Sequence, residues 1–162
     1  MKKFLIGALI VLAGISLLTL KCGATDEREF ARPDLIPYIE QVSADYGVSP
    51  ELIEAMIETE SRGISSVSNG SCIGLMQVST RWHRDRAARL GADMHTDEGN
   101  ILTGVDYLME MAAEEEDLFY VLAKYNGQSD AAPGRSNGYA TEILNRTVEL
   151  EVVHGKHQYE SK

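Results

Sequence analysis

Short apolar stripes at helical spacing, each closed by a helix-ending signal, limit the fold of this chain most strongly. The first stripe recurs every three or four residues and stops at Gly47: Leu35, Ile36, Ile39 and Val42. Ser49, Pro50 and Glu51 then restart a helix. A serine caps a helix, a proline fits its first position, and the helix dipole favours an acid there. The spacing predicts a second helix that ends at about residue 61.

The same reasoning predicts further helices along the chain. Ser79 or Thr80 caps one helix that ends before Gly91, and Asp97 caps the next. Helix-spaced apolar residues then continue in three groups: Ile101, Val105, Leu108 and Met109; Leu118, Val121, Leu122 and Tyr125; Tyr139, Ile143 and Leu150. These groups predict three more helices.

The segments between the stripes set the boundaries of the domain. Residues 63–73 and 128–138 are rich in Gly, Ser and Asn and are expected to be loops. No run of alternating β-branched residues predicts a substantial strand. We therefore expect a compact all-α domain of five to seven short helices over residues 34–146. A polar C-terminal tail is expected at residues 147–162, frayed from about residue 152.

The N-terminus carries a long apolar run. Residues 4–20 hold no charge, with Lys2 and Lys3 before them and Lys21 after them. A basic start followed by an apolar run is typical of a secretory signal. At ~1.5 Å per residue the run is roughly 26 Å long, which also suits an uncleaved membrane anchor with its lysines inside.

Both interpretations of the N-terminus stay open. Small residues before a cut after Ala24 favour a cleaved signal, whereas the length of the run favours an anchor. A lipoprotein at Cys22 is disfavoured because a lysine stands directly before it. Residues 1–24 are thus expected to be a signal peptide or membrane anchor, and residues 25–33 a linker. Either form exports the rest of the chain.

The charge excludes one class of partner. The chain has 25 acidic and 15 basic residues, a formal net charge of −10, which excludes nucleic acid because phosphate binding needs a basic face. Removing residues 1–24 removes three lysines and no acid, so 25 acidic and 12 basic residues remain, a net charge of −13. Attraction by net charge is therefore not expected to supply affinity for an anionic partner.

One carboxylate, Glu60, falls on the apolar face of the second helix. That face is made by Ile53, Met56 and Ile57, and Glu60 follows at i+7. The other carboxylates of the helix are expected to face water: Glu51, Glu54 and Glu58. Burial raises a carboxyl pKa, as a general acid near neutral pH needs. The alternative is that Glu60 ends the helix and bends out to water.

A second segment of interest runs from Ser68 to Gln77. Its glycines flank an apolar stretch and allow a ligand to approach the backbone closely. The side-chain amide of Gln77 suits a hydrogen bond to a sugar hydroxyl or amide. By spacing alone the signal is weak, and an ordinary buried turn is the favoured interpretation.

Five ordered motifs together resemble the soluble-type lytic transglycosylase domain, which is related in fold to goose-type lysozyme. They cover about residues 34 to 144 and read as follows: Glu60-Ser61, Gly74-Leu75-Met76-Gln77, Asn100-Ile101 with Gly104 and Tyr107-Leu108, Tyr125-Asn126, and Tyr139. The resemblance implies a lysozyme-like helical domain that acts on peptidoglycan, needs no cofactor and holds no metal.

The resemblance also implies roles for single residues. Glu60 matches the single catalytic acid and base, and Tyr125 the tyrosine that orients it. The other residues implied to bind substrate are Ser61, Ser68, Met76, Gln77, Asn126 and Tyr139. Asn100, Gly104, Tyr107 and Leu108 match a motif that is mostly structural. Two departures stand out: Ser71-Cys72 replaces Gly-Ala, and Tyr125-Asn126-Gly127-Gln128 replaces Tyr-Asn-Ala-Gly, which affects distal subsites more than Glu60.

The implied reaction cleaves the β-1,4 bond between N-acetylmuramic acid and N-acetylglucosamine. Most glycosidases use two carboxyl groups, but no motif here places a second one. In this family the substrate acetamido group is thought to assist, Glu60 protonates the leaving oxygen, and the C6 hydroxyl closes a 1,6-anhydro ring. The product makes the enzyme a lyase rather than a hydrolase. The alternatives are a lysozyme-like hydrolase and a wall-binding or scaffold module with weak catalysis.

The remaining candidates carry less weight. His154 and His157 form an HxxH pair without the acid of a zinc-protease motif, so no metal site is expected. Trp82 is expected as a half-buried core aromatic or a sugar platform. The chain is expected in the extracytoplasmic envelope of a bacterium, attached to the membrane through residues 4–20 if uncleaved. Envelope assembly machinery is a further expected partner.

Overall fold

A computed structural model describes residues 29–127 and 137–160, with side chains up to residue 155. One 3-10 helix and six α-helices dominate this part: η1 (Pro33–Leu35), α1 (Ile36–Tyr46), α2 (Pro50–Ser61), α3 (Arg84–Leu90), α4 (Asp97–Ala112), α5 (Leu118–Tyr125) and α6 (Gly138–Glu160). The prediction of a mostly helical domain is confirmed. Within the described ranges no helix is long and apolar enough to cross a membrane, and the predicted signal or anchor at residues 1–24 lies outside them.

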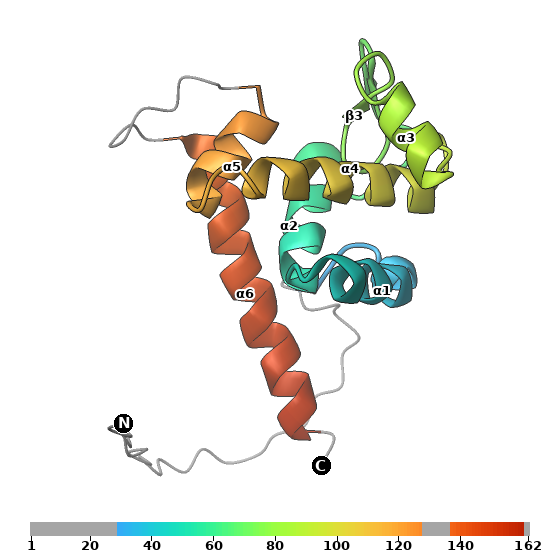
Figure 1. Cartoon of the computed structure of the whole chain (residues 1–162). Helices are drawn as coiled ribbons and strands as arrows, with labels where there is room; N and C mark the ends of the chain where they lie inside the picture. Colours follow the sequence, from blue (N-terminus) through green and yellow to red (C-terminus); the bar gives the residue numbers. More distant parts are fainter. Residues whose placement is uncertain (1–28, 128–136, 161–162) are drawn as a thin grey trace, which may run out of the picture.

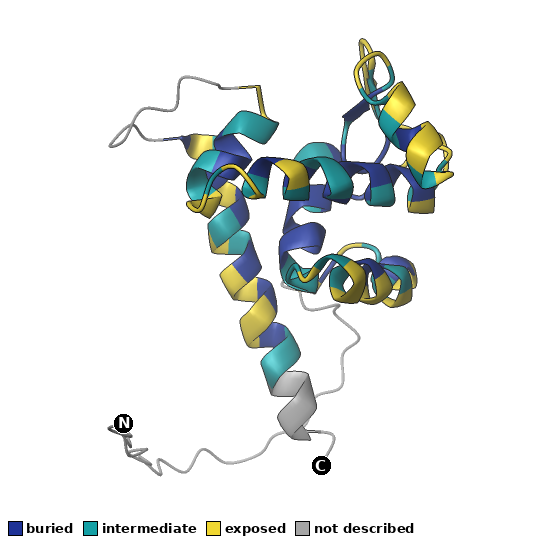
Figure 2. Cartoon of the chain, viewed as in Figure 1, coloured by how far each residue is buried: buried dark blue, intermediate teal, exposed yellow. Residues whose placement is uncertain are grey.

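Helix α2 lies at the centre of the domain, between α1 and α6 (Figure 1). Its start has the predicted chemistry, because the Ser49 hydroxyl accepts a hydrogen bond from the backbone N–H of Leu52 at 3.4 Å and Pro50 opens the helix. All six residues from Leu52 to Ile57 are buried, as the dark blue of α2 in Figure 2 shows. The catalytic candidate on this helix therefore stands on the most enclosed element of the fold.

The prediction that Glu51, Glu54 and Glu58 of α2 face water was wrong. Helix α6 covers this side of α2 and supplies polar partners to its carboxylates. Glu54 is only 1% exposed, and His154 of α6 lies against it and against Glu51. Glu58 forms an ion pair with Arg146 of α6 at 2.5 Å. Helix α2 has apolar residues on one side only, but neighbouring elements cover both of its sides.

Helix α6 is longer than its apolar pattern predicted. It runs from Gly138 to Glu160, so residues 147–160 extend the helix instead of forming a frayed polar tail. The physical reason is packing: Thr147, Leu150 and Val153 are all buried and continue the stripe that contacts α2. The threonine bonds back to the carbonyl of Ile143 at 2.8 Å, so its polarity does not interrupt that stripe.

Helix α4 crosses the domain and contacts α1, α3 and α5. Its cap is Thr96, whose hydroxyl accepts from the backbone N–H of Gly99 at 3.1 Å, rather than the predicted Asp97. The carboxylate of Asp97 instead pairs with Arg32 at 2.9 Å.

A small antiparallel sheet joins α2 to α3 where only a loop was expected. Its strands have two residues each: β1 (Ser68–Asn69), β2 (Cys72–Ile73) and β3 (Val78–Ser79), in that order. Since residues 78–79 pair with β2, α3 starts only at Arg84, later than predicted. Strands this short give no alternating pattern to detect.

Candidate active site

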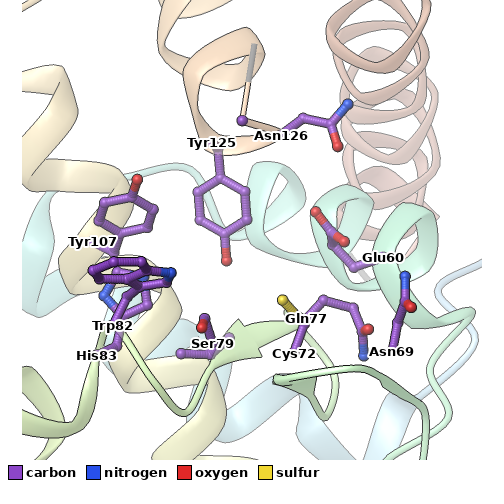
Figure 3. Close-up of a pocket in the computed structure, with 12 residues that line it drawn as sticks. Glu60, Asn69, Cys72, Gln77, Ser79, Trp82, His83, Tyr107, Tyr125 and Asn126 are labelled. Carbon is purple, nitrogen blue, oxygen red and sulfur yellow. The ribbon is translucent and has the colours of Figure 1, made fainter. Parts of the chain in front are cut away.

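A cleft of about 460 Å³ opens beside the C-terminal end of α2 (Figure 3). This volume is in the range of small-ligand sites. The side chains that define it come from five parts of the fold: Glu60, Gln77, Trp82, His83, Tyr107 and Tyr125. In Figure 3, Glu60 lies on one side of the cleft and Trp82 on the other.

Glu60 enters the cleft from the last turn of α2. The helix ends directly after it because Arg62 and Gly63 both take left-handed backbone angles, with φ of 55° and 73°. The half-buried carboxylate accepts a hydrogen bond at Oε1 from the hydroxyl of Tyr139, at the start of α6. Burial raises the pKa of Glu60, and the bond from Tyr139 offsets part of that rise because it favours the charged form.

The floor of the cleft is the Gly74-Leu75-Met76-Gln77 segment, which one side chain of α4 holds in place. Asn100 accepts from the backbone N–H of Met76 at 2.8 Å and donates to the carbonyls of Ile73 and Met94 at 2.9 and 3.1 Å. Gly74 has a φ of 77°, and a Cβ there would lie 2.4 Å from the Asn100 amide. Asn100 therefore works as a structural residue, tying the floor to α4.

Gln77 presents one end of its amide to the cleft. It has a φ of 46°, and its Nε2 donates to the carbonyls of Gly74 and Val67 at 2.8 and 3.1 Å. Both N–H groups are thus used within the protein. The side-chain oxygen accepts from no residue in the described part of the chain, so it suits a donor on a ligand.

An aromatic wall faces Glu60 across the cleft. The rings of His83 and Tyr107 lie 4.3 Å apart between centroids, and those of Tyr107 and Tyr125 lie 5.5 Å apart. The Tyr125 hydroxyl donates to the carbonyl of Met76 at 2.8 Å, which fixes the wall to the floor. Burial keeps the pKa of Tyr125 well above its ordinary value, so this hydroxyl stays a donor.

The structure brings together part of the predicted set. Glu60, Gln77, Tyr125 and Asn126 line the cleft, and Tyr139 contacts Glu60. The contact with the carboxylate therefore comes from Tyr139, whereas the resemblance implied that Tyr125 orients it.

Three predicted residues lie elsewhere. Ser61 is buried and donates back to the carbonyl of Ile57 at 3.0 Å, and Met76 is fully buried against Gly104. Ser68 lines a separate hollow on the other side of the small sheet, with Met94 and Thr96. None of these three side chains lines the cleft beside Glu60.

Sequence reasoning missed several residues of the cleft, among them Cys72, Ser79 and His83. Tyr107 was assigned to a structural motif but also lines the cleft. The signal that was available is the run Trp82-His83, which begins five residues after Gln77. In the described part of the chain no three His, Cys, Asp or Glu side chains gather in a geometry that could hold a metal ion.

Comparison with known proteins adds two findings. The model of the transglycosylase SLT domain family matches residues 37–146. Among solved structures, the chain is similar to the lytic transglycosylase Slt of Pseudomonas aeruginosa, solved as an inactive mutant, with a TM-score of 0.66 and 16% sequence identity. The match covers 78% of this chain and 25% of that one, so this chain spans about a quarter of the length of Slt. No curated protein matches the chain.

Proposed function

Because the chain belongs to the transglycosylase SLT domain family, we propose that it is a peptidoglycan lytic transglycosylase with Glu60 as its single acid and base. The proposed bond is the β-1,4 linkage between N-acetylmuramic acid and N-acetylglucosamine. The proposed product carries a 1,6-anhydromuramyl end.

The observation that carries the proposal is the environment of Glu60. It is half-buried at the cleft, its pKa is raised by burial, and Tyr139 holds one oxygen of its carboxyl group. Among the described residues that line the cleft, it is the one carboxylate. A raised pKa suits a group that must donate a proton and then accept one near neutral pH. The inactive Slt mutant has a glutamine in place of a glutamate, which supports a catalytic glutamate in this fold.

The first step needs the acid form of Glu60. Its proton passes to the glycosidic oxygen as the bond to C1 of the muramic acid breaks. The acetamido oxygen of the same sugar attacks C1, so the substrate supplies the nucleophile that a second carboxylate supplies in most glycosidases. The N-acetylglucosamine leaves with its C4 oxygen as a hydroxyl group, and Glu60 is left as a carboxylate.

The second step needs the base form of the same residue. Glu60 takes the proton from the C6 hydroxyl, whose oxygen then bonds to C1 and displaces the acetamido oxygen. The ring closes, Glu60 regains its proton, and no water is consumed. The hydrogen bond from Tyr139 would stabilise the carboxylate between the two steps.

Mass analysis of released fragments tests the proposal. Purified peptidoglycan is incubated with the full chain and with the Glu60→Gln variant, and soluble muropeptides are measured. Anhydro products from the wild type and none from the variant are the expected result. Products heavier by one water would show hydrolysis instead, and binding without any soluble product would show a wall-binding module.

Export is part of the same proposal. The apolar run at residues 4–20 and its flanking lysines support delivery to the extracytoplasmic envelope, as a signal or as an anchor. Fractionation of bacterial cells that express the chain would test this, with the N-terminus of the mature protein identified by mass spectrometry. Recovery of the full chain in the cytoplasm would contradict export.

A further inference from the structure

The side of the cleft opposite Glu60 ends in an exposed aromatic residue. Trp82 is 73% exposed, although large aromatic side chains usually bury most of their surface. It lines the cleft on one side and an adjoining hollow of about 430 Å³ on the other. A ligand longer than the cleft would therefore meet this indole before it reached the hollow.

Two arginines flank the indole in this hollow. The guanidinium of Arg81 lies 4.9 Å from the centroid of the Trp82 ring, and Arg84 lines the same hollow with Asp85. Two arginines against one aspartate leave one net positive charge. This local positive charge contrasts with the net charge of the whole chain, which is −10.

The charges of the two arginines are available. Their neighbours Arg86 and Arg89 are paired with Asp106, the latter at 2.9 Å. In contrast, neither Arg81 nor Arg84 forms an ion pair with any described residue, and both are exposed. Leaving two exposed guanidinium groups beside a cleft, in an acidic protein, favours a role in binding anions.

We propose that Arg81, Trp82 and Arg84, here called the rim, bind the anionic peptide stem of a peptidoglycan strand whose sugars occupy the cleft. The inference rests on the proposed function, and it assigns the binding of the peptide part of that substrate to the rim. Arg81 lies over one face of the indole, and the other face is offered to the strand as it leaves the cleft. The two guanidinium groups offer paired N–H donors to the stem carboxylates.

The charge of the rim also favours a stem over a bare sugar. Removing a stem leaves one lactyl carboxylate on each muramic acid, close to the sugar ring, whereas a stem carries its own carboxylates farther from the ring. A carboxylate gains from a guanidinium that no other acid occupies, because no existing ion pair must be broken first. The rim thus supplies locally the attraction that the net charge of the chain opposes.

Binding by an inactive chain separates this inference from the proposed function. In the full chain carrying Glu60→Gln, affinity is measured for two sets of glycan fragments of equal length, one with stems and one with the stems removed by an amidase. The Arg81→Gln/Arg84→Gln change is expected to weaken binding of stem-bearing fragments about tenfold. It is expected to leave binding of stem-free fragments unchanged.

Two further variants sharpen the test. Trp82→Ala is expected to weaken both sets of fragments, because the indole contacts the strand itself. Arg62→Gln removes a positive charge away from the cleft and is the matched control, with no expected change. Thermal unfolding of each variant checks that the fold is retained.

The outcomes are distinct. Equal weakening of stem-bearing and stem-free fragments by the double arginine change would overturn stem recognition, and so would no change in either. The wild type could release no soluble fragments while the double arginine change still weakens binding of stem-bearing fragments alone. The proposed function would then be wrong, and stem binding by the rim would be supported. If cleavage is normal but the double arginine change affects both sets of fragments equally, only the proposal for the rim is wrong.

Discussion

Helix α2 carries one buried and one half-buried carboxyl group, and their surroundings differ. Burial raises the pKa of both Glu54 and Glu60, and each meets a side chain of α6. Glu60 opens to the cleft and receives a hydrogen bond from Tyr139. Glu54 is 1% exposed, its Oε2 has no hydrogen-bond partner among the described residues, and the nearest ring nitrogen of His154 is 3.6 Å away.

The difference teaches that a raised pKa does not by itself mark a catalytic acid. Both carboxyl groups lose solvation, but only Glu60 can reach a substrate. In Glu54 the same physical effect acts on folding: the carboxyl group is stable in its protonated form and costs free energy when charged. Access to the cleft, and a donor that supports the charged form, distinguish the two.

Replacing the two residues by glutamine gives the largest expected contrast. Glu60→Gln removes the proton donor and should lower turnover of peptidoglycan by roughly a thousandfold or more, within the range of general acid–base catalysis. Its thermal unfolding should stay close to that of the wild type. Glu54→Gln, assayed beside it, should keep activity within about twofold. Equal loss of activity in both variants would abolish the distinction.

The pH dependence of stability should reveal Glu54. Burial raises its pKa from 4.5 to about 7. Since the folded pKa exceeds the unfolded one, its stabilising contribution is complete below about pH 4.5 and is lost as pH rises through about 7. The free energy of unfolding of the wild type should therefore fall by up to roughly 3 kcal/mol more than that of Glu54→Gln across this window. Parallel curves from chemical denaturation would contradict this.

Tyr139→Phe tests the support given to Glu60. Loss of the hydrogen bond removes a contact that favours the carboxylate, so the pKa of Glu60 should rise further. The acid form then persists to higher pH, and the alkaline limb of the kcat profile should shift upward. We expect kcat at the optimum to fall about tenfold. Tyr38→Phe on α1 is the control and should move neither quantity; a downward shift in Tyr139→Phe would reverse the assignment.

His154→Gln should have the smallest effect. The ring of His154 contacts Glu51 at 2.9 Å, and its charge lowers the pKa of Glu54. The variant should lose about 1 kcal/mol of stability near pH 6. Because the pKa of Glu54 then rises, the decline in stability should extend to higher pH. Calorimetry at several pH values measures both, and an unchanged profile would show that His154 does not act on Glu54.

Local spacing was sufficient to predict the helices whose apolar residues and capping residues lie close together in the sequence. The start of α2 is the best case, because Ser49 and Pro50 act within a few residues. The covered acidic face of α2 was not predictable in the same way. It depends on α6, whose buried stripe includes Thr147 and whose contacting residues lie about 90 to 100 positions away, as in the pair Glu58 and Arg146.

The site shows the same limit. Glu60 was identified because its helical position and the family motifs agree. Its partner Tyr139 stands 79 residues away, so the contact between them has no local signature. Gln77 was expected to bind sugar with its amide, but the amide N–H groups serve the backbone of the neighbouring loop. Only the fold shows which end of that side chain is left for a ligand.

The three hydrogen bonds of Asn100 have a consequence for the order in which the molecule opens. The small sheet has strands of only two residues, and a single amide group fastens the floor segment to α4. Helix α2, in contrast, is a continuous α-helix of 12 residues whose middle is buried. Free energies of local opening follow such differences. Amide protons of the floor should exchange with solvent long before those of α2, through excursions that leave the helical core and the carboxyl group of Glu60 in place.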